Sequence, residues 1–182
     1  MEVVPSRLPD VLVIRPDVFE DSRGFFMESW NQKAFEKAGI DATFVQDNHS
    51  SSVAHTVRGL HYQIEQAQGK LVRVVAGEVF DVVVDLRKSS PDFGQWAGEL
   101  LSAENRKQLW IPPGFAHGFL VLSERADFEY KCTDYYAPEH ERTLLWNDPD
   151  IGIEWPLLDR EKPLLSGKDE AGVPLGDAEV YD

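Results

Sequence analysis

Short apolar runs, each ended by glycine, proline, asparagine or aspartate, limit what this chain can fold into more than any other feature. The clearest run is EVFDVVVDL, in which alternate residues from Phe80 to Leu86 are apolar and Asp81 and Asp85 lie between them. An alternation with a period of two is typical of a β-strand whose faces meet different surroundings. Repeated at this spacing, such runs predict a β-sandwich or β-barrel rather than a helical bundle.

The same pattern predicts the order of elements along the chain. Strands are expected at 11–15, 23–30, 43–48, 56–63, 70–76, 78–87, 95–102, 108–111, 117–122, 126–136 and 143–146. In the first half only NQKAFEKAG predicts a helix, with Asn31 as its N-cap and Gly39 as its stop. From Pro149 onward the proline-rich sequence predicts an irregular tail with short helices. Because no repeat, low-complexity tract or linker interrupts the chain, one antiparallel β-domain over 1–182 is expected.

Charge and composition exclude several classes of partner. A net charge of −14, from 32 acidic and 18 basic residues, opposes binding to nucleic acid and provides no polybasic membrane patch. No apolar run approaches the roughly 20 residues that span a bilayer. The opening MEVVPSRLPD lacks the basic start and apolar run of a secretion signal. The single cysteine, Cys132, is expected to fill the core. One cysteine cannot form a disulfide within the chain, which agrees with the predicted cytoplasmic location.

One segment places a histidine directly after a tight turn. In KQLWIPPGFAHGFLVL, Pro112 and Gly114 form the expected turn and His117 begins an alternating strand. Many double-stranded β-helix (cupin) proteins use this Pro-x-Gly-x-x-His pattern to place a metal-binding histidine. The segment therefore predicts that His117 faces a cavity inside a cupin-like fold.

A second histidine occurs in HYQIE, where a metal-binding cupin would supply His-x-His and a following Glu. Here His61 takes the first position, but Gln63 takes the second. A neutral glutamine is a poor ligand for zinc, iron or nickel. The substitution favours a site without a metal, in which the histidines are free for acid–base chemistry, although His61, Glu65 and His117 leave a three-ligand alternative open.

Nine segments in order carry a resemblance to a known family. They are RGFFMESW (23–30), QDNHSSS (46–52), RGLHYQ (58–63), KLVRVVAGEVFDVVVDLR (70–87), SPDFGQW (90–96), IPPGFAHGF (111–119), YKCTDYYAPEHE (130–141), WNDPDIGIEWP (146–156) and LSGKD (165–169). Together they resemble the dTDP-4-dehydrorhamnose 3,5-epimerase family. The resemblance implies a dimeric cupin jelly roll with short flanking helices, without metal or cofactor, acting on dTDP-4-keto-6-deoxy-D-glucose on the way to dTDP-L-rhamnose.

The resemblance also implies catalytic roles that agree with the chemistry. A ketone at C4 acidifies the hydrogens on C3 and C5, so inversion needs a base on one face, a donor for the enolate oxygen and an acid on the other face. His61 would be the base and Asp169 its orienting partner. Lys70 would stabilise the enolate, and Tyr130 would be the acid.

The remaining implied residues bind substrate. They are Arg23, Gln46, Asn48, Arg58, His117 and Lys168 for diphosphate, sugar or base, with Phe19 and Tyr136 on the two sides of the thymine. The segment DSRGFFMES is implied to cross to a neighbouring subunit, with strand exchange near 19–30, so that Arg23, Phe26 and Glu28 serve the partner's site. Asp81 is expected to pair with His117 as a second dyad.

Two local features qualify this assignment. Arg58 and His61 have opposite strand parity, so both can face one cavity only if the strand bulges near Gly59. HYQIEQAQGK lacks the prolines common in the family and is one residue shorter, so the loop before Lys70 is expected to fold differently.

Several functions remain open from the sequence. They are a mono-epimerase that inverts only C3 or only C5, a 3,4-ketoisomerase on a related dTDP-keto sugar, a metal-dependent cupin and a non-catalytic nucleotide-sugar binding module.

Overall fold

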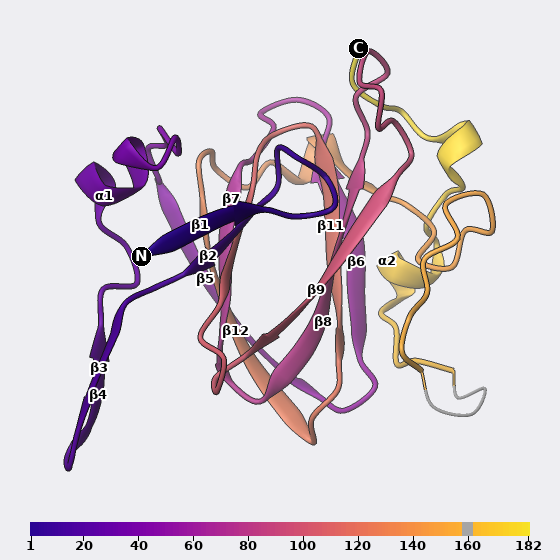
Figure 1. Cartoon of the computed structure of the whole chain (residues 1–182). Coiled ribbons are helices and arrows are strands. Elements are labelled where there is room, and N and C mark those ends of the chain that lie inside the picture. Colours follow the sequence, from indigo (N-terminus) through magenta and orange to yellow (C-terminus); the bar gives the residue numbers. More distant parts are fainter. Residues whose placement is uncertain (158–161) are drawn as a thin grey trace.

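Two antiparallel β-sheets form the body of the protein (Figure 1), in a computed structural model that describes residues 1–157 and 162–182. The predicted all-β jelly-roll architecture is confirmed. The six-stranded sheet has the order β1-β2-β10-β7-β12-β5. Its strands are β1 (Glu2–Pro5), β2 (Leu12–Arg15), β10 (Gln108–Ile111), β7 (Lys70–Ala76), β12 (Arg125–Cys132) and β5 (Gln46–Val53).

The five-stranded sheet has the order β13-β6-β11-β8-β9. Its strands are β13 (Glu141–Thr143), β6 (Val57–Gln63), β11 (Phe115–Val121), β8 (Glu78–Asp85) and β9 (Trp96–Ser102). Consecutive strands often lie in different sheets, as β6 and β7 do, so residues far apart in the chain meet between the sheets.

Smaller elements flank the two sheets. They are the hairpin strands β3 (Val18–Asp21) and β4 (Gly24–Met27), the helices α1 (Gln32–Lys37) and α2 (Gly167–Glu170), and the 3₁₀ helices η1 (Pro138–His140) and η2 (Leu175–Asp177). The predicted caps of α1 are confirmed, since Asn31 accepts a hydrogen bond from the Ala34 N–H and Gly39 has a φ of 90°. None of the helices in the described ranges is both long and apolar enough to span a bilayer.

The main core lies between the sheets. Val72 and Phe128 of the six-stranded sheet pack there with Val83 and Phe119 of the five-stranded sheet. The alternating face of β8 that carries Val83 therefore points inward, together with the fully buried Asp81. Burying a carboxylate in such a core requires a partner, which identifies this part of the interior as a polar site.

The apolar outer face of β8 packs against the C-terminal tail. Val82 and Val84 lie in a second cluster with Trp155, Val180 and Tyr181 of the tail. This packing places the predicted irregular tail on the body and supports the five-stranded sheet from outside.

The observed strands differ from the predicted ones mainly at their ends. The sequence pattern predicts neither β1 nor β3, which have four residues each. The strand predicted at 43–48 is wrong in its limits, because β5 pairs with β12 from Gln46 to Val53. The strand predicted at 126–136 ends at Cys132, since the Asp134 carbonyl accepts a hydrogen bond from the Gln68 side chain instead of a strand partner.

Candidate active site

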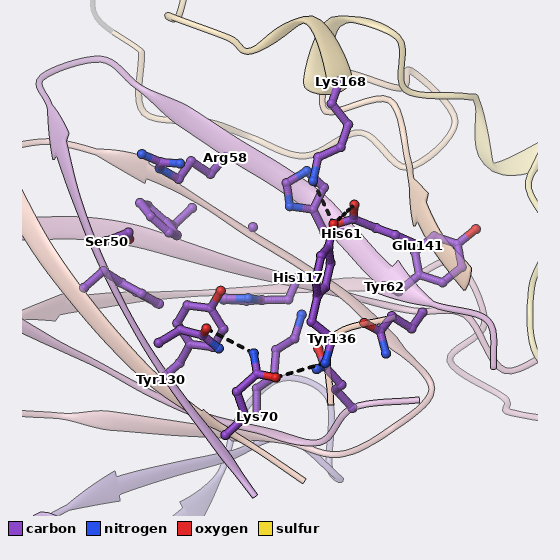
Figure 2. A pocket seen from close by; sticks show the side chains of 17 residues that line it. Ser50, Arg58, His61, Tyr62, Lys70, His117, Tyr130, Tyr136, Glu141 and Lys168 are labelled. Atoms are coloured by element: carbon purple, nitrogen blue, oxygen red, sulfur yellow. Dashed lines mark hydrogen bonds and ion pairs between the residues drawn. The ribbon is translucent and has the colours of Figure 1, made fainter. Parts of the chain in front are cut away.

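A cavity of about 370 Å³ opens between the two sheets and brings together most of the predicted site residues (Figure 2). The predicted residues that line it are Gln46, Asn48, Arg58, His61, Lys70, His117, Tyr130, Tyr136 and Lys168. The lining residues that the sequence analysis did not assign to the site are Ser50, Tyr62, Gln63, Gln68, Gly118, Phe119, Phe128 and Glu141.

His61, on β6, is paired with a buried carboxylate from the C-terminal tail. Its Nε2 lies 2.6 Å from Oδ1 of Asp169, whose side chain is 4% exposed. The Asp169 carboxylate also accepts hydrogen bonds from the Gly59 N–H and the Ser166 hydroxyl. Burial raises the pKa of Asp169, but the hydrogen bonds from His61 and Ser166 outweigh burial, so this pKa lies well below its usual range.

The imidazole itself is suited to accept a proton. Burial lowers the pKa of His61, and the hydrogen bond to Asp169 only partly opposes this effect. The ring is therefore neutral near pH 7, with one nitrogen bound to Asp169 and the other left for a ligand in the cavity. A carboxylate that orients an imidazole and stabilises its protonated form is the arrangement of a general base.

A bulge in β6 lets Arg58 and His61 face the same cavity. In the pairing with β11, His61 lies opposite His117 and Arg58 lies opposite Phe119, so three residue steps match two. Gly59 lies inside the bulge with a φ of 116°, and a Cβ there would lie 2.7 Å from the His117 carbonyl oxygen. The predicted bulge is confirmed, and it depends on glycine.

The second histidine, His117, is paired with Asp81 of the neighbouring strand β8. Its Nε2 lies 2.9 and 3.0 Å from the two carboxylate oxygens, so the predicted hydrogen bond is present. The side chains are 8% and 0% exposed, which makes this pair more deeply buried than the pair formed by His61. Burial raises the pKa of Asp81, and the charge of His117 lowers it only in part.

The opposite wall of the cavity belongs to the six-stranded sheet. Lys70 begins β7 and Tyr130 lies on β12, and both side chains line the cavity. Burial lowers the pKa of Lys70 and raises the pKa of Tyr130, so the phenol stays protonated at neutral pH. Cys132 is buried, as predicted, and its Sγ accepts a 3.5 Å hydrogen bond from Asn48.

The rim of the cavity contains a residue that the sequence analysis missed. Glu141 accepts hydrogen bonds from the Lys168 ammonium at 2.7 Å and from the Tyr136 hydroxyl at 3.0 Å. Burial raises the pKa of Glu141, but Lys168 lowers it more, so the carboxylate stays charged. Glu141 is the last residue of YKCTDYYAPEHE, and η1 separates it from β12. The strand alternation of β12 therefore does not predict on which side Glu141 lies.

Gln63 supports the backbone instead of facing a metal. Its side-chain nitrogen donates to the carbonyls of Gln66 and Tyr135, and its oxygen accepts from the Ala137 N–H. These bonds hold the start of the loop that leads to Lys70.

The three-ligand metal alternative does not assemble from its expected residues. The Glu65 carboxylate lies 3.7 Å from His140 and is absent from the cavity lining. In residues 1–157 and 162–182, no group of three or more His, Cys, Asp or Glu side chains is placed to hold a metal ion.

The predicted residues of the segment 19–30 lie away from this cavity. Phe19, Arg23 and Phe26 belong to the β3–β4 hairpin, which projects from the body in Figure 1. Arg23 pairs with Asp21 within the hairpin, and Glu28 follows β4. Within one chain, therefore, these four predicted residues do not join the site, which is the position expected if they serve a second subunit.

Comparisons with known proteins agree with this fold and site. The family model described as dTDP-4-dehydrorhamnose 3,5-epimerase matches residues 5–177. The chain belongs to this family. A family member from Pseudomonas aeruginosa, named dTDP-4-dehydrorhamnose 3,5-epimerase, is 61% identical over 182 residues, covering 100% of this chain and 99% of that protein. The protein is therefore an epimerase, an enzyme of the isomerase class.

Solved structures of relatives share the whole fold. The epimerase of Legionella pneumophila, in complex with dTDP-4-keto-L-rhamnose, has a TM-score of 0.94 at 52% identity, covering 98% of this chain and 94% of that one. A 3'-monoepimerase from Streptomyces bikiniensis, in complex with dTDP-quinovose, has a TM-score of 0.88 at 35% identity, covering 95% and 87%. The epimerase family thus includes members with different outcomes on one fold.

Proposed function

We propose that the protein inverts C3 and C5 of dTDP-4-keto-6-deoxy-D-glucose and forms dTDP-4-keto-L-rhamnose for dTDP-L-rhamnose biosynthesis. The observation that carries the proposal is that His61 and Tyr130 line one cavity from opposite sheets. A sugar ring between them presents one face to a base and the other face to an acid. The dTDP-4-keto-L-rhamnose bound to the Legionella pneumophila relative supports this substrate class.

The first step is proton removal by His61. The free ring nitrogen takes the C3 proton, and the electron pair of the broken C–H bond moves into an enolate whose charge rests on the C4 oxygen. Asp169 holds the imidazole in place and stabilises the imidazolium that forms. Lys70 supplies the positive charge that stabilises the enolate oxygen.

The second step is protonation from the opposite face. The Tyr130 hydroxyl donates its proton to C3, which inverts the centre, and solvent then reprotonates the phenolate while His61 releases its proton. The same two steps at C5 complete the reaction. Because burial raises the pKa of Tyr130, the phenol is protonated before each step.

Binding of the nucleotide uses the basic and polar residues of the cavity. Arg58 and Lys168 place positive charge beside the diphosphate, against the acidic background of the chain. Gln46 and Asn48 lie on one face of β5 and contact sugar or base. Tyr136, which is 53% exposed, offers its ring to the thymine at the rim.

The active unit in this proposal is a homodimer. Phe19 and Phe26 are 65% and 66% exposed on the projecting hairpin, which is unusual for phenylalanine without a partner. In the partner's cavity, Phe19 covers the second face of the thymine opposite Tyr136, and Arg23 and Glu28 contact the substrate. The free thiol of Cys132 and the nucleotide-linked substrate support a cytoplasmic location in this proposal.

Incubation with the 4-keto sugar nucleotide in deuterated water tests the reaction. The expected result is one deuterium at C3 and one at C5, with dTDP-4-keto-L-rhamnose as the product. Deuterium at only one of these carbons would identify a mono-epimerase, and a carbonyl that moves from C4 to C3 would identify a ketoisomerase. Binding of the nucleotide sugar without any exchange would identify a binding module.

A further inference from the structure

We propose that Arg106 is a positioning residue that sets the β3–β4 hairpin at the angle needed by the partner's active site. The inference rests on the proposed function, because it requires the hairpin to serve a second copy of this chain. It concerns a residue in the β9–β10 turn, outside the cavity and outside the catalytic residues.

Register within the hairpin separates its side chains into two faces. Phe19 lies opposite Phe26, and Glu20 lies opposite Phe25. Directly opposed residues share a face, and neighbouring residues along a strand alternate. Phe19 and Phe26 therefore form one face of the hairpin, and Glu20 and Phe25 form the other.

Arg106 contacts the second of these faces. Its guanidinium donates to the Glu20 carboxylate at 2.7 Å and lies 4.2 Å from the centre of the Phe25 ring. The planar group thus makes an ion pair and a cation–π contact at the same time, with a flat fork of donors that the lysine ammonium lacks. We call these two contacts, with Glu20 and Phe25, the Arg106 clamp. They lie on the face opposite Phe19 and Phe26, which is the face that would enter the partner's site.

The turn that carries Arg106 is itself held firmly. The Arg106 N–H donates to the Ser102 carbonyl, and the Asn105 side chain accepts from the N–H groups of Ser102 and Lys107. The Arg106 side chain is 23% exposed. β9 and β10 belong to different sheets, so the turn between them is anchored to both sheets. Arg106 therefore holds the hairpin in a defined orientation relative to the two sheets.

The clamp matters because the hairpin projects from the body as a two-stranded sheet. An isolated hairpin of this size is only marginally stable and changes its angle easily. Aromatic stacking on a base requires a ring at a defined distance and tilt. Arg106 restricts the orientations of the hairpin before the nucleotide binds, so that Phe19 loses less conformational entropy when it stacks on the base in the partner's site.

The first test is Arg106→Ala with the dTDP-keto sugar as substrate. The expected result is a KM raised roughly 3- to 10-fold with kcat changed less than about 2-fold, since base stacking is equal in the ground and transition states. Lys107→Ala is the matched control, because Lys107 pairs with Glu99 instead of the hairpin. Arg106→Lys, which keeps the charge without the planar group, should lie between Arg106→Ala and the parent.

Folding is controlled by melting temperature and by the oligomeric state. Arg106 has a φ of 54°, so alanine replaces one non-glycine residue by another at a strained position. If Arg106→Ala keeps the parent KM while Phe19→Ala raises it, the clamp is wrong and the proposed role of the hairpin stands. If both variants keep the parent KM, the role of Arg106 and the stacking role of Phe19 both fail, whereas the proposed reaction is still judged by deuterium uptake.

Mixed dimers then show on which subunit Arg106 acts. Differently tagged chains carrying Arg106→Ala and His61→Asn are combined, so that the only active cavity belongs to the Arg106→Ala chain and receives an intact hairpin. The expected KM is that of the parent, at half the activity per dimer. A raised KM in the mixed dimer would show that Arg106 acts on its own subunit, which overturns the inference.

Discussion

The two histidine–carboxylate pairs of the cavity have similar geometry and different surroundings. His61 and Asp169 come from β6 and the C-terminal tail, whereas His117 and Asp81 lie on adjacent strands of one sheet. The His61 side chain is 23% exposed and that of His117 is 8% exposed. The carboxylate pKa is lowered in the first pair and raised by burial in the second.

This difference distinguishes a partly exposed pair with a charged carboxylate from a more deeply buried pair. Asp169 accepts hydrogen bonds from several donors, so it stays charged while His61 gains and loses a proton. Asp81 accepts its hydrogen bonds from His117, so loss of this side chain leaves a buried acid without that partner. We therefore propose that the first pair supplies the base, and that the second supports the cavity wall and contacts the substrate.

The largest expected effect comes from His61→Asn compared with His117→Asn. His61→Asn should lower kcat by roughly 10²–10⁴, with a small change in melting temperature, because it removes a positioned base. His117→Asn should lower kcat/KM only about 10-fold, mainly through KM, but should lower the melting temperature more, since Asp81 loses its buried partner. Turnover and thermal unfolding are measured on both variants.

Deuterium exchange shows which of the two histidines removes the substrate protons. His61→Asn should stop uptake of deuterium at C3 and C5, and His117→Asn should allow it. The opposite pattern would reverse the assignment of the two pairs.

Tyr130→Phe tests the proposed acid on the face of the substrate opposite His61. If His61 removes the proton and Tyr130 returns one, the variant should lose product formation by about 10- to 100-fold more than it loses exchange of the substrate's own hydrogens. Packing against Phe128 should survive, because the ring is retained, so melting should change little. A normally folded Tyr130→Phe protein with parent activity would exclude Tyr130 as the acid.

The pH dependence of kcat/KM tests the pKa of the first pair. Because burial lowers the pKa of His61, its imidazole stays neutral below the usual value of about 6.5, and activity is lost only as the pH falls through the lowered pKa. Across that interval the unfolded chain binds the extra proton, so the contribution of His61 to stability rises with pH up to about 6.5.

Asp169→Asn is the matched variant for the pH profile. Asp169 raises the pKa of His61, so its loss should move the acid limb to still lower pH in whatever activity remains. An acid limb above 6.5 in the parent protein would contradict the assigned base.

Chelation should have the smallest effect. Exhaustive treatment with a chelator should change the rate by less than about twofold, because Gln63 is bonded to the backbone and Glu65 is directed to His140. Metal content and rate are measured before and after treatment. Loss of activity that zinc, iron or nickel restores would show that the enzyme needs a metal. The assignment of the two histidine–carboxylate pairs as metal-free groups would then be wrong.

The sequence predicted the class of fold because strand periodicity is local. Alternation in β8, the helix caps of α1 and the glycine required by the β6 bulge all depend on residues close together in the chain. The same local patterns, with the resemblance to the family, predicted His61, Lys70, Tyr130 and Asp169 as site residues. Glu141 was missed because it occupies no periodic position and faces the site only after η1 turns the chain.

Only the tertiary structure decided which of these residues meet. Periodicity divides β8 into two faces but does not say that Asp81 points between the sheets while Val82 packs against the tail. It also does not bring Asp169 to His61, since 108 positions separate them and their contact depends on the packing of α2 against β6. These contacts depend on strand pairing and layer packing over long distances in sequence, and such energies belong to the assembled fold rather than to any short segment.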